Sequence, residues 1–302
     1  MKTSLRIGVD LGGTKIEGII VDPSRPWNEW PRERMATDAS GGYERIVDTV
    51  VLMIEKLQRD VPSGAPVGVG MPGSVTAAGL VKNSNTQCLN GRDFRRDLRN
   101  RISAPVAFAN DANCFALAEA QYGAGQKYEL VFGVIMGTGV GGGIVWNGEV
   151  REGPHSIAGE WGHTALWPDF GETCYCGKSG CVEQFISGPA VESMYRKTVG
   201  LNASMHHICQ LAQRGDSQAS ACIDSLVDNF ARALSNVMNT LDPDAVVLGG
   251  GLSHVEALYT RGVERLKKYV FSDEMTTPIL QNALGDSAGV IGAAMLPVYG
   301  KQ

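Results

Sequence analysis

The chain has 302 residues, which is enough for one large domain or for two ordinary domains with their own cores. Hydrophobic residues make up 43% of the sequence and charged residues 20%, so the composition is that of a soluble globular protein. The net charge of −5 disfavours nucleic acid and anionic membranes as partners, and no stretch reaches the roughly 18 apolar residues of a membrane span. The first residues carry no apolar segment with a cleavage site, so we expect a cytoplasmic protein.

The first predicted feature is a glycine hairpin. Residues 5–10 are typical of a buried strand, and L-G-G-T-K turns the chain into a second strand over residues 16–21. β-Branched residues follow the glycines, where a Walker loop or a dinucleotide-binding fingerprint would begin a helix. The backbone N–H groups of such a turn could hold phosphate, with Asp10 at its mouth. An ordinary hairpin turn remains the alternative.

The next part of the chain predicts core elements. Residues 23–40 are polar and predict irregular structure, whereas apolar residues at helical spacing from Tyr43 to Leu57 predict an amphipathic helix. Residues 67–71 alternate as a strand that ends in P-G-S. A polar loop with Asn83 follows, and a short helix is expected around Phe94.

Asn110 and Asp111 mark a second candidate site. They directly follow a predicted strand over residues 106–109, and a helix is expected to begin there. Ligands of open α/β sheets bind at this carboxyl edge. Simple N-capping of the helix is the alternative.

The strand–glycine–strand pattern then recurs. Residues 130–136 predict a strongly apolar strand, followed by G-T-G-V-G-G-G, a return strand from Ile144 and a hairpin signal at Asn147-Gly148. The recurrence indicates two related halves, each with a phosphate-binding hairpin.

Between residues 158 and 184 lies a set of metal-binding residue types. His163, Cys174, Cys176 and Cys181 match the Cys₃His set of a closed, structural zinc site, in which no water can be activated. A disulfide or reduced core cysteines are the alternatives. A bound metal would make this segment rigid and so hold Glu160 and Glu183 in place. A polyhydroxylated ligand requires hydrogen-bond acceptors that are held in this way. Otherwise both are surface carboxylates.

The remaining chain predicts helices and two more strands. Helices are expected over residues 188–197, 203–214 and 223–241. A buried strand over residues 245–248 leads through G-G-G-L-S into another helix, and this glycine run could let a flat base approach the backbone. A strand near residues 278–280 precedes a closing helix, residues 288–296, that Asp286 is expected to cap.

With these motifs in place, the chain resembles the bacterial ROK family (repressors, open reading frames and kinases). The resemblance spans nearly the whole chain and rests on D-L-G-G-T-K at Asp10–Lys15, N-D-A-N at Asn110–Asn113, G-T-G-V-G-G-G at Gly137–Gly143, G-E-W-G-H at Gly159–His163, C-x-C-G-x-x-G-C-x-E at Cys174–Glu183 and L-G-G-G-L-S at Leu248–Ser253. The most similar subgroup is the bacterial fructokinases (manno(fructo)kinases), through V-K-N-x-N with L-N-G at Val81–Gly91, G-E-W-G-H, and F-I-S-G at Phe185–Gly188. Bacterial N-acetylglucosamine kinases share most motifs but are less similar at these three places.

The resemblance implies an α/β fold of the duplicated actin-like ATPase (ribonuclease H-like) type, with two domains flanking a cleft and a structural zinc site. We expect a smaller domain of residues 1–118 and 286–302 and a larger domain of residues 119–285. The implied activity is that of an ATP-dependent hexose kinase, most similar to fructokinase, that converts fructose, with or without mannose, to the 6-phosphate. ATP, Mg²⁺ and structural Zn²⁺ are the implied cofactors, and homodimers are common in the family.

The resemblance also assigns roles to residues. Asp111 is the expected general base, which accepts the proton of the sugar hydroxyl, and Asp10 is expected near Mg²⁺. The implied ATP- and phosphate-binding residues are Asp10, Gly12, Gly13, Thr14, Lys15, Gly137, Thr138, Gly139, Gly249, Gly250 and Gly251. The implied sugar-binding residues are Gly73, Asn83, Asn110, Asp111, Glu160, His163 and Glu183. His163 would place one ring nitrogen on zinc and the other toward the sugar. A solvated Lys15 is an equally good interpretation.

Three alternatives stay open. The first is an N-acetylglucosamine kinase of the same family. The second is a sugar-sensing ROK regulator, which carries a helix-turn-helix domain ahead of the ATPase-like part; the first strand begins by Leu5, so the sequence leaves no room for it. The third is a catalytically idle sugar-binding protein, which intact Asp111 and both hairpins disfavour.

Overall fold

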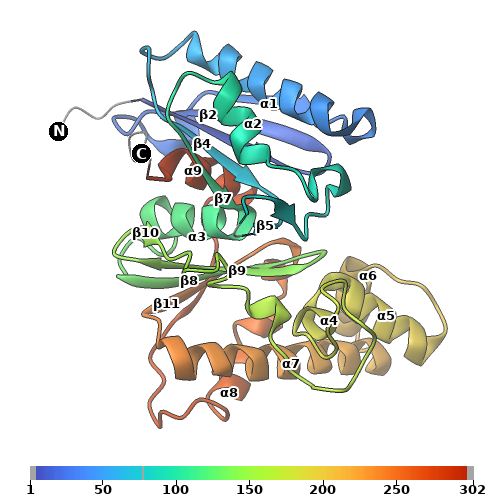
Figure 1. Cartoon of the computed structure of the whole chain (residues 1–302). Coiled ribbons are helices and arrows are strands. Elements are labelled where there is room, and N and C mark those ends of the chain that lie inside the picture. The colour runs from blue at the N-terminus through green and yellow to red at the C-terminus, as the bar shows by residue number, and fades with distance from the viewer. Residues whose placement is uncertain (1–4, 77, 298–302) are drawn as a thin grey trace. The chain divides into compact units, whose positions relative to one another are not determined.

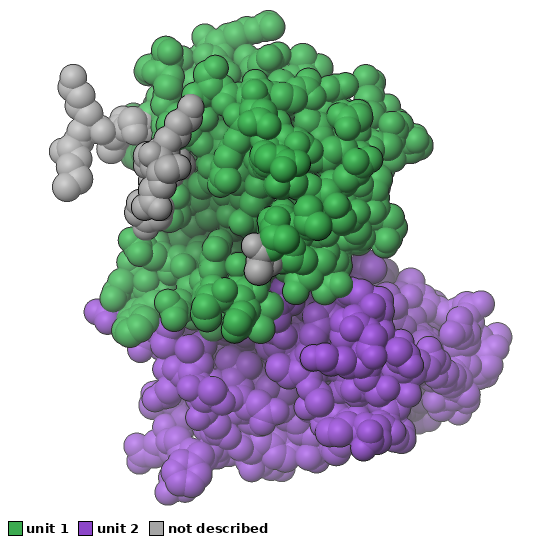
Figure 2. Space-filling view, viewed as in Figure 1, with its two compact units in different colours: residues 1–127, 143–158, 283–302 green, residues 128–142, 159–282 purple. Residues whose placement is uncertain are grey.

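The computed structural model describes residues 5–76 and 78–297, which form two compact units (Figure 2). Unit 1 comprises residues up to 127, residues 143–158 and residues from 283 onward, and unit 2 comprises residues 128–142 and 159–282. Within the described part of the chain, no helix is long and apolar enough to cross a membrane.

Strands and helices are mixed along the chain, and four helices follow one another over residues 183–241 without an intervening strand (Figure 1). The strands are β1 (Arg6–Leu11), β2 (Lys15–Val21), β3 (Arg32–Ala36), β4 (Val67–Met71), β5 (Ser74–Val75), β6 (Val81–Lys82), β7 (Val106–Asn110), β8 (Leu130–Met136), β9 (Val140–Trp146), β10 (Glu149–Val150), β11 (Ala245–Gly249) and β12 (Ile279–Gln281). The helices are α1 (Gly42–Gln58), α2 (Phe94–Arg101), α3 (Asp111–Tyr122), α4 (Glu183–Ile186), α5 (Gly188–Val199), α6 (Met205–Gln213), α7 (Ser217–Leu241), α8 (Arg261–Leu266) and α9 (Ala288–Met295).

The sheet of unit 1 has the order β3-β2-β1-β4-β7, with β1–β2–β3 antiparallel and β1–β4–β7 parallel. Glycines on its strands let helices approach both faces. A Cβ at Gly68 would lie 1.7 Å from the Ala293 carbonyl oxygen of α9, and a Cβ at Gly18 would lie 2.6 Å from the Met53 sulfur of α1. The helices therefore pack directly on the sheet, and a larger residue at Gly68 would force α9 away from it.

The second sheet has the order β10-β9-β8-β11-β12, in which β11 is parallel to β8 and β12. It repeats the first: a hairpin strand lies beside the first strand, and two later strands join on the other side. This repetition supports the two related halves predicted from the sequence. The chain passes from unit 2 to unit 1 within β9, after residue 142.

Helices α5 to α8 belong to unit 2. The 25-residue α7 is the longest among the described residues, and α5, α6 and α8 all contact it (Figure 1). Its N-cap is Asp216, whose side chain accepts a hydrogen bond from the Ala219 N–H at 2.8 Å. Asp242, at a φ of 48°, ends it directly before Pro243. Ile223, Leu226, Phe230, Leu234 and Met238 lie at helical spacing on α7 and are buried.

Some local predictions are wrong. Residues 32–36 form strand β3 inside the segment predicted to be irregular, and residues 140–143 lie in β9 rather than in the glycine turn. G-G-G-L-S leads into a 3-10 turn (Gly251–His254) and not directly into an α-helix. Asp286 lies in the 3-10 turn before α9, and Ser287 occupies the N-cap position. Polar edge strands and short 3-10 turns carry no hydrophobic period, so sequence patterning misses them.

Candidate active site

The first hairpin is held closed by its own backbone. The Gly12 N–H donates to the Lys15 carbonyl at 3.0 Å, and a Cβ at Gly12 would lie 2.8 Å from the same oxygen. Thr37 adds a clamp, because its N–H donates to the Thr14 carbonyl at 3.0 Å and its hydroxyl to the Gly12 carbonyl at 2.6 Å. Gly13 and Thr14 stay exposed at the tip. The turn predicted to hold phosphate is therefore preformed.

Lys15 forms an ion pair with Glu17. Its ammonium lies 3.6 Å from the Glu17 carboxylate, which also accepts a hydrogen bond from the Arg34 guanidinium at 3.0 Å. Glu17 is only 3% exposed, and its Oε1 has no hydrogen-bond partner among the described residues. The sequence interpretation missed Glu17. The signal for it was an acidic residue within a β-branched strand, directly opposite Asp10 in the hairpin register.

Asp10 carries a strongly perturbed carboxyl group. Burial, and after it the charges of Asp111 and Glu17, raise its pKa to about 7 against the opposing effect of Lys15. Gly289 of α9 permits this packing, since a Cβ there would lie 2.9 Å from the Asp10 carboxylate. The charge of Asp111 thus raises the pKa of Asp10, and two carboxylates placed in this way are suited to share a divalent cation, whose charge would favour their ionised forms.

Asn110 and Asp111 lie at the junction of β7 and α3, as predicted. The Asn110 side chain caps α3, because it accepts a hydrogen bond from the Asn113 N–H at 2.8 Å. The Asp111 carboxylate accepts one from the Ala112 N–H at 2.8 Å and remains exposed. Although the residue has exposed surface, desolvation of its carboxyl group by the surrounding protein raises the pKa of Asp111, and this backbone hydrogen bond opposes the rise. The capping alternative is thus confirmed for Asn110, and Asp111 is an exposed residue at the start of α3.

The second hairpin is held from the junction of α4 and α5. The Gly188 N–H donates to the Gly137 carbonyl at 2.8 Å, and the Gly137 N–H donates to the Gly139 carbonyl at 2.9 Å. Just after the turn, the Val140 N–H donates to the Glu183 carboxylate at 2.9 Å. The glycine turn is therefore fixed at both ends by residues that follow the cysteine segment.

A cavity of about 870 Å³ opens beside this hairpin within unit 2. Gly137 and Thr138 of the turn and Gly251 of the third glycine run are among its lining residues. Gly250 sits at a φ of 76°, where a Cβ would lie 2.4 Å from the Met136 carbonyl oxygen. The lining also includes Glu192 of α5 and His206, Cys209, Gln210 and Gln213 of α6. The volume and the glycine backbone suit a nucleoside with its phosphates at the hairpin.

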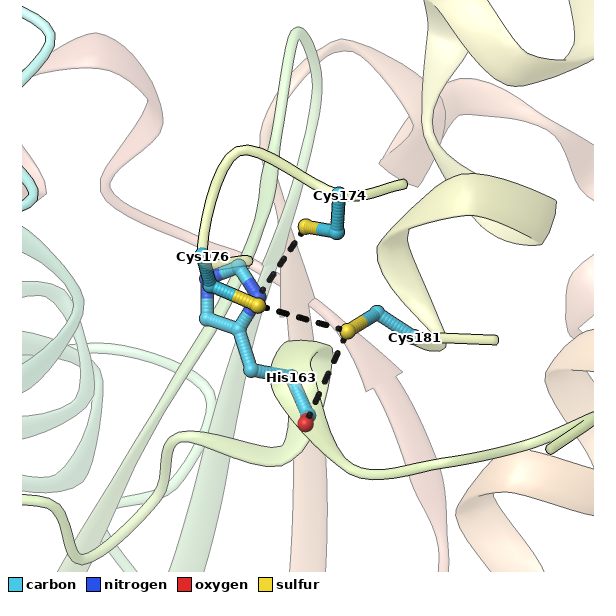
Figure 3. Close-up of side chains that lie close together, drawn as sticks. All are labelled: His163, Cys174, Cys176 and Cys181. Atoms are coloured by element: carbon cyan, nitrogen blue, oxygen red, sulfur yellow. Dashed lines mark hydrogen bonds between the residues drawn. The ribbon is translucent and has the colours of Figure 1, made fainter. Parts of the chain in front are cut away.

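The cysteine segment folds its four predicted ligands onto one point (Figure 3). The ligand atoms of His163, Cys174, Cys176 and Cys181 all lie within 4.8 Å of one another. The thiols of Cys176 and Cys181 are 3.6 Å apart, and Cys174 Sγ is 3.7 Å from His163 Nδ1. Zn–S bonds of about 2.3 Å in a tetrahedron place thiolates about 3.7 Å apart, whereas a disulfide would need about 2.05 Å. The donor set and spacing fit zinc.

Tight turns build this cluster. Gly177 and Gly180 have φ values of 84° and 76°, and a Cβ at Gly180 would lie 2.1 Å from the Trp167 carbonyl oxygen. Burial and the neighbouring thiols raise the pKa of Cys181 to about 12. Because zinc binds the thiolate, metal binding must release this proton.

His163 uses both ring nitrogens. Its Nδ1 faces the thiols, and its Nε2 lies 2.8 Å from the Tyr175 hydroxyl, with the two rings edge to face. The nitrogen predicted to face the sugar therefore contacts Tyr175 here. Glu160 lies just before the 3-10 turn that carries His163. The sequence interpretation missed Tyr175, and its place between two metal-binding cysteines was the available signal.

The remaining predicted sugar residues lie on the β5–β6 hairpin of unit 1. Gly73 has a φ of 84°, and a Cβ there would lie 2.6 Å from the Lys82 carbonyl oxygen. Asn83 is exposed at a φ of 56°. Unit 1 therefore holds Gly73, Asn83, Asn110 and Asp111, and unit 2 holds Glu160, His163 and Glu183.

Comparison with known proteins identifies the family. A sequence profile of the ROK family matches residues 6–298. The chain belongs to the ROK family. Its relatives include N-acetyl-D-glucosamine kinases of Photobacterium profundum, 38% identical over 305 residues, and of Escherichia coli O1:K1 / APEC, 35% identical over 299 residues. Both alignments cover 96% of this chain and 98% of the relative.

Solved structures confirm the fold. The ROK hexokinase of Thermus thermophilus superposes with a TM-score of 0.87 at 30% identity, covering 96% of this chain and 97% of that one. A ROK glucokinase of Streptomyces griseus, solved in complex with glucose and AMPPNP, superposes with a TM-score of 0.77 at 28% identity, covering 96% of this chain and 98% of that one. The ROK sugar-kinase family and its mixed α/β, actin-like ATPase fold, both expected from the sequence, are confirmed.

Proposed function

We propose that this ROK protein is an ATP-dependent sugar kinase whose preferred substrate is N-acetyl-D-glucosamine. The carboxylate of Asp111 carries the proposal for the reaction. It is exposed at the first turn of α3, it has a raised pKa, and it lies near a second perturbed carboxylate, Asp10. A general base needs this combination of access and raised proton affinity.

The proposed reaction is an in-line phosphoryl transfer. Asp111 accepts the proton of a sugar hydroxyl while that oxygen forms a bond to the γ-phosphorus. The bond from the γ-phosphorus to the bridging oxygen breaks, and ADP leaves with the electron pair. Asp10 would hold Mg²⁺, which supplies charge neutralisation at the phosphates. Backbone N–H groups of the two hairpins, at residues 12–14 and 137–139, would position the γ-phosphoryl group.

The sugar would be bound by the predicted residues Gly73, Asn83, Asn110, Glu160, His163 and Glu183. Zinc, held by His163 and the three cysteines, would fix the histidine ring and leave no position for an activated water. The adenosine would lie in the 870 Å³ cavity beside the glycine run at residues 249–251. The expected homodimer and cytoplasmic location remain predictions.

The choice of sugar follows the relatives. Relatives that match nearly the full chain at 35–38% identity are named N-acetyl-D-glucosamine kinases, the alternative substrate expected from the sequence. Two motifs that resembled fructokinases have local structural roles. The Asn90 side chain accepts a hydrogen bond from the Ser84 N–H at 2.9 Å, and Ser187 caps α5 through the Ala190 N–H at 3.3 Å. Motifs that fix a loop or a helix end carry little information about the sugar.

The test is a substrate panel. ADP release would be measured with ATP and Mg²⁺ on N-acetylglucosamine, N-acetylmannosamine, glucose, mannose and fructose, with a blank that lacks sugar. We expect the highest kcat/KM on N-acetylglucosamine. A preference for fructose would return the chain to the fructokinase interpretation, and equal rates with and without sugar would remove the kinase proposal altogether.

A further inference from the structure

Glu183 connects two sites that the sequence treats as separate. It is the first residue of α4, two positions after the metal-ligand candidate Cys181, and it was predicted as a sugar ligand. Its Oε2 accepts the hydrogen bond from the Val140 N–H at 2.9 Å, directly after the phosphate-binding turn. A Cβ at Gly139 would lie only 2.8 Å from the same oxygen. The carboxylate therefore packs against the turn itself.

The two carboxylate oxygens are not equivalent. Oε2 is engaged with the hairpin, whereas Oε1 has no hydrogen-bond partner within residues 5–76 and 78–297. A carboxylate oxygen can accept two hydrogen bonds. Glu183 can thus accept a sugar hydroxyl on one oxygen while the other still holds the hairpin.

The other end of the turn is held from the first residue of α5, which follows α4 closely in the chain. Gly188, which follows α4 and Ser187, donates its N–H to the Gly137 carbonyl at 2.8 Å. Gly137 and Gly188 both line the nucleotide-sized cavity. The four-residue α4 therefore links the zinc cluster at its start to both ends of the turn, and Glu183 supplies the side-chain contact of that link.

We infer that Glu183 is a positioning residue for the phosphate-binding hairpin as well as a sugar ligand, and that it couples sugar affinity to nucleotide affinity. The inference rests on the proposed kinase function. A charged acceptor holds an N–H more strongly than a neutral one, so the hairpin keeps its conformation better with the carboxylate present. Coupling of binding sites is reciprocal: if sugar binding orders this carboxylate and raises nucleotide affinity, nucleotide raises sugar affinity by the same factor.

The experiment compares three substitutions by calorimetry on the full, zinc-loaded chain. The affinities for Mg·AMPPNP and for N-acetylglucosamine are measured alone and together. Glu183→Gln keeps an acceptor for the Val140 N–H, so we expect sugar affinity to fall about tenfold or more and nucleotide affinity to change by less than about threefold. Glu183→Ala removes the acceptor, so we expect nucleotide affinity without sugar to fall by about five- to tenfold as well.

Gly139→Ala provides an independent variant that keeps the carboxylate. Its methyl group would meet the flexible end of Glu183, which must swing away from the Val140 N–H. We expect this substitution in the nucleotide hairpin to lower sugar affinity measured without nucleotide. Glu172→Ala is the matched control, because this carboxylate of the same segment is 81% exposed and, among the described residues, forms an ion pair only with Lys197, at 3.1 Å. Zinc content and melting temperature verify that each variant is folded.

Several outcomes would overturn the inference. The hairpin role would be excluded if Glu183→Ala left nucleotide affinity unchanged, or if Glu183→Gln and Glu183→Ala lowered nucleotide affinity equally. It would also be excluded if Gly139→Ala left sugar affinity unchanged. Failure of the proposed function looks different, because the wild-type chain would then neither bind nor phosphorylate a sugar. The nucleotide affinities measured without sugar would still test the hairpin contact in that case.

Discussion

Asp111 is the single side chain on which the proposed chemistry depends. Asp111→Asn keeps the size of the side chain and an acceptor for the Ala112 N–H, so the fold and sugar affinity should be retained. The amide cannot accept the hydroxyl proton, and we expect kcat to fall by about 10²- to 10⁴-fold. ADP release and sugar calorimetry check both halves of the prediction. Asp60→Asn, at an exposed position after α1, is the control. Near-normal turnover of Asp111→Asn would exclude this residue as the base.

Tyr175 contacts the nitrogen of His163 that the sugar is expected to use. When Nδ1 binds a metal, the ring of neutral His163 has one N–H group, at Nε2. This N–H can donate a hydrogen bond to Tyr175 or to a sugar hydroxyl. The tyrosine is 66% exposed and can move aside. We therefore expect Tyr175→Phe to lower the sugar KM by about two- to tenfold, the range of one hydrogen bond, with kcat unchanged.

The control for this substitution is Tyr128→Phe, since the Tyr128 hydroxyl has no hydrogen-bond partner within the described ranges. Steady-state kinetics with saturating ATP would measure both variants. A higher sugar KM in Tyr175→Phe would show instead that the phenol itself holds the sugar.

At the scale of elements, the cysteine segment is a loop that a metal would stabilise. It has only two isolated β-bridges, Ala165 with Cys181 and Thr173 with Ser179, and the 3-10 turn at Trp161–His163. Cys176→Ser or chelation should therefore lower the melting temperature by about 5 °C or more, because metal binding stabilises the folded state. Sugar affinity should fall with it, since His163 and Glu183 flank the cluster.

Differential scanning fluorimetry, metal analysis and sugar calorimetry would be run together on Cys176→Ser. Cys88→Ser is the control, because Cys88 lies in unit 1, outside the cluster. Equal zinc content, melting temperature and sugar affinity in wild type and Cys176→Ser would contradict the zinc interpretation.

Elements with a strong apolar period could be predicted from the sequence, and others could not. The strand at residues 130–136 and the helix α1 were found because each buries an apolar run or stripe. Strand β3 was missed because none of its side chains is buried, and its pairing with β2 depends on backbone hydrogen bonds. For residues 140–143 the run of glycines predicts a turn, but glycine is present there because the strand packs closely against other backbone. A Cβ at Gly142 would lie 2.8 Å from the Gly159 carbonyl oxygen.

At the scale of the whole molecule, the residues of the candidate site also divide into those that could be predicted from the sequence and those that could not. The clustering of His163 with the three cysteines and the position of Asp111 at the start of α3 could be predicted, since both depend on residue type and short spacing. Glu17 and Tyr175 could not, because their contacts depend on register and on loop geometry. The shared role of Glu183 joins α4 to a hairpin 43 residues earlier, a contact that only the folded chain reveals.

The pH dependence of the stability of the whole chain provides a last test, through Asp10. Its pKa of about 7 in the folded protein lies above the ordinary value of 3.8, so between these pH values the folded chain holds a proton that the unfolded chain releases. The free energy of unfolding should therefore fall as pH rises from about 4 to about 7, since burial and the charges of Asp111 and Glu17 disfavour the ionised carboxylate and Lys15 offsets them in part. Asp10→Asn removes this dependence. The variant should gain about 2 to 3 kcal/mol relative to wild type between pH 5 and pH 8. Urea unfolding without Mg²⁺ measures the free energy of unfolding at each pH. Asp60→Asn is the control, and its difference from wild type should stay constant over this range. A pH-independent difference between Asp10→Asn and wild type would show that Asp10 is ionised in the folded chain throughout this range.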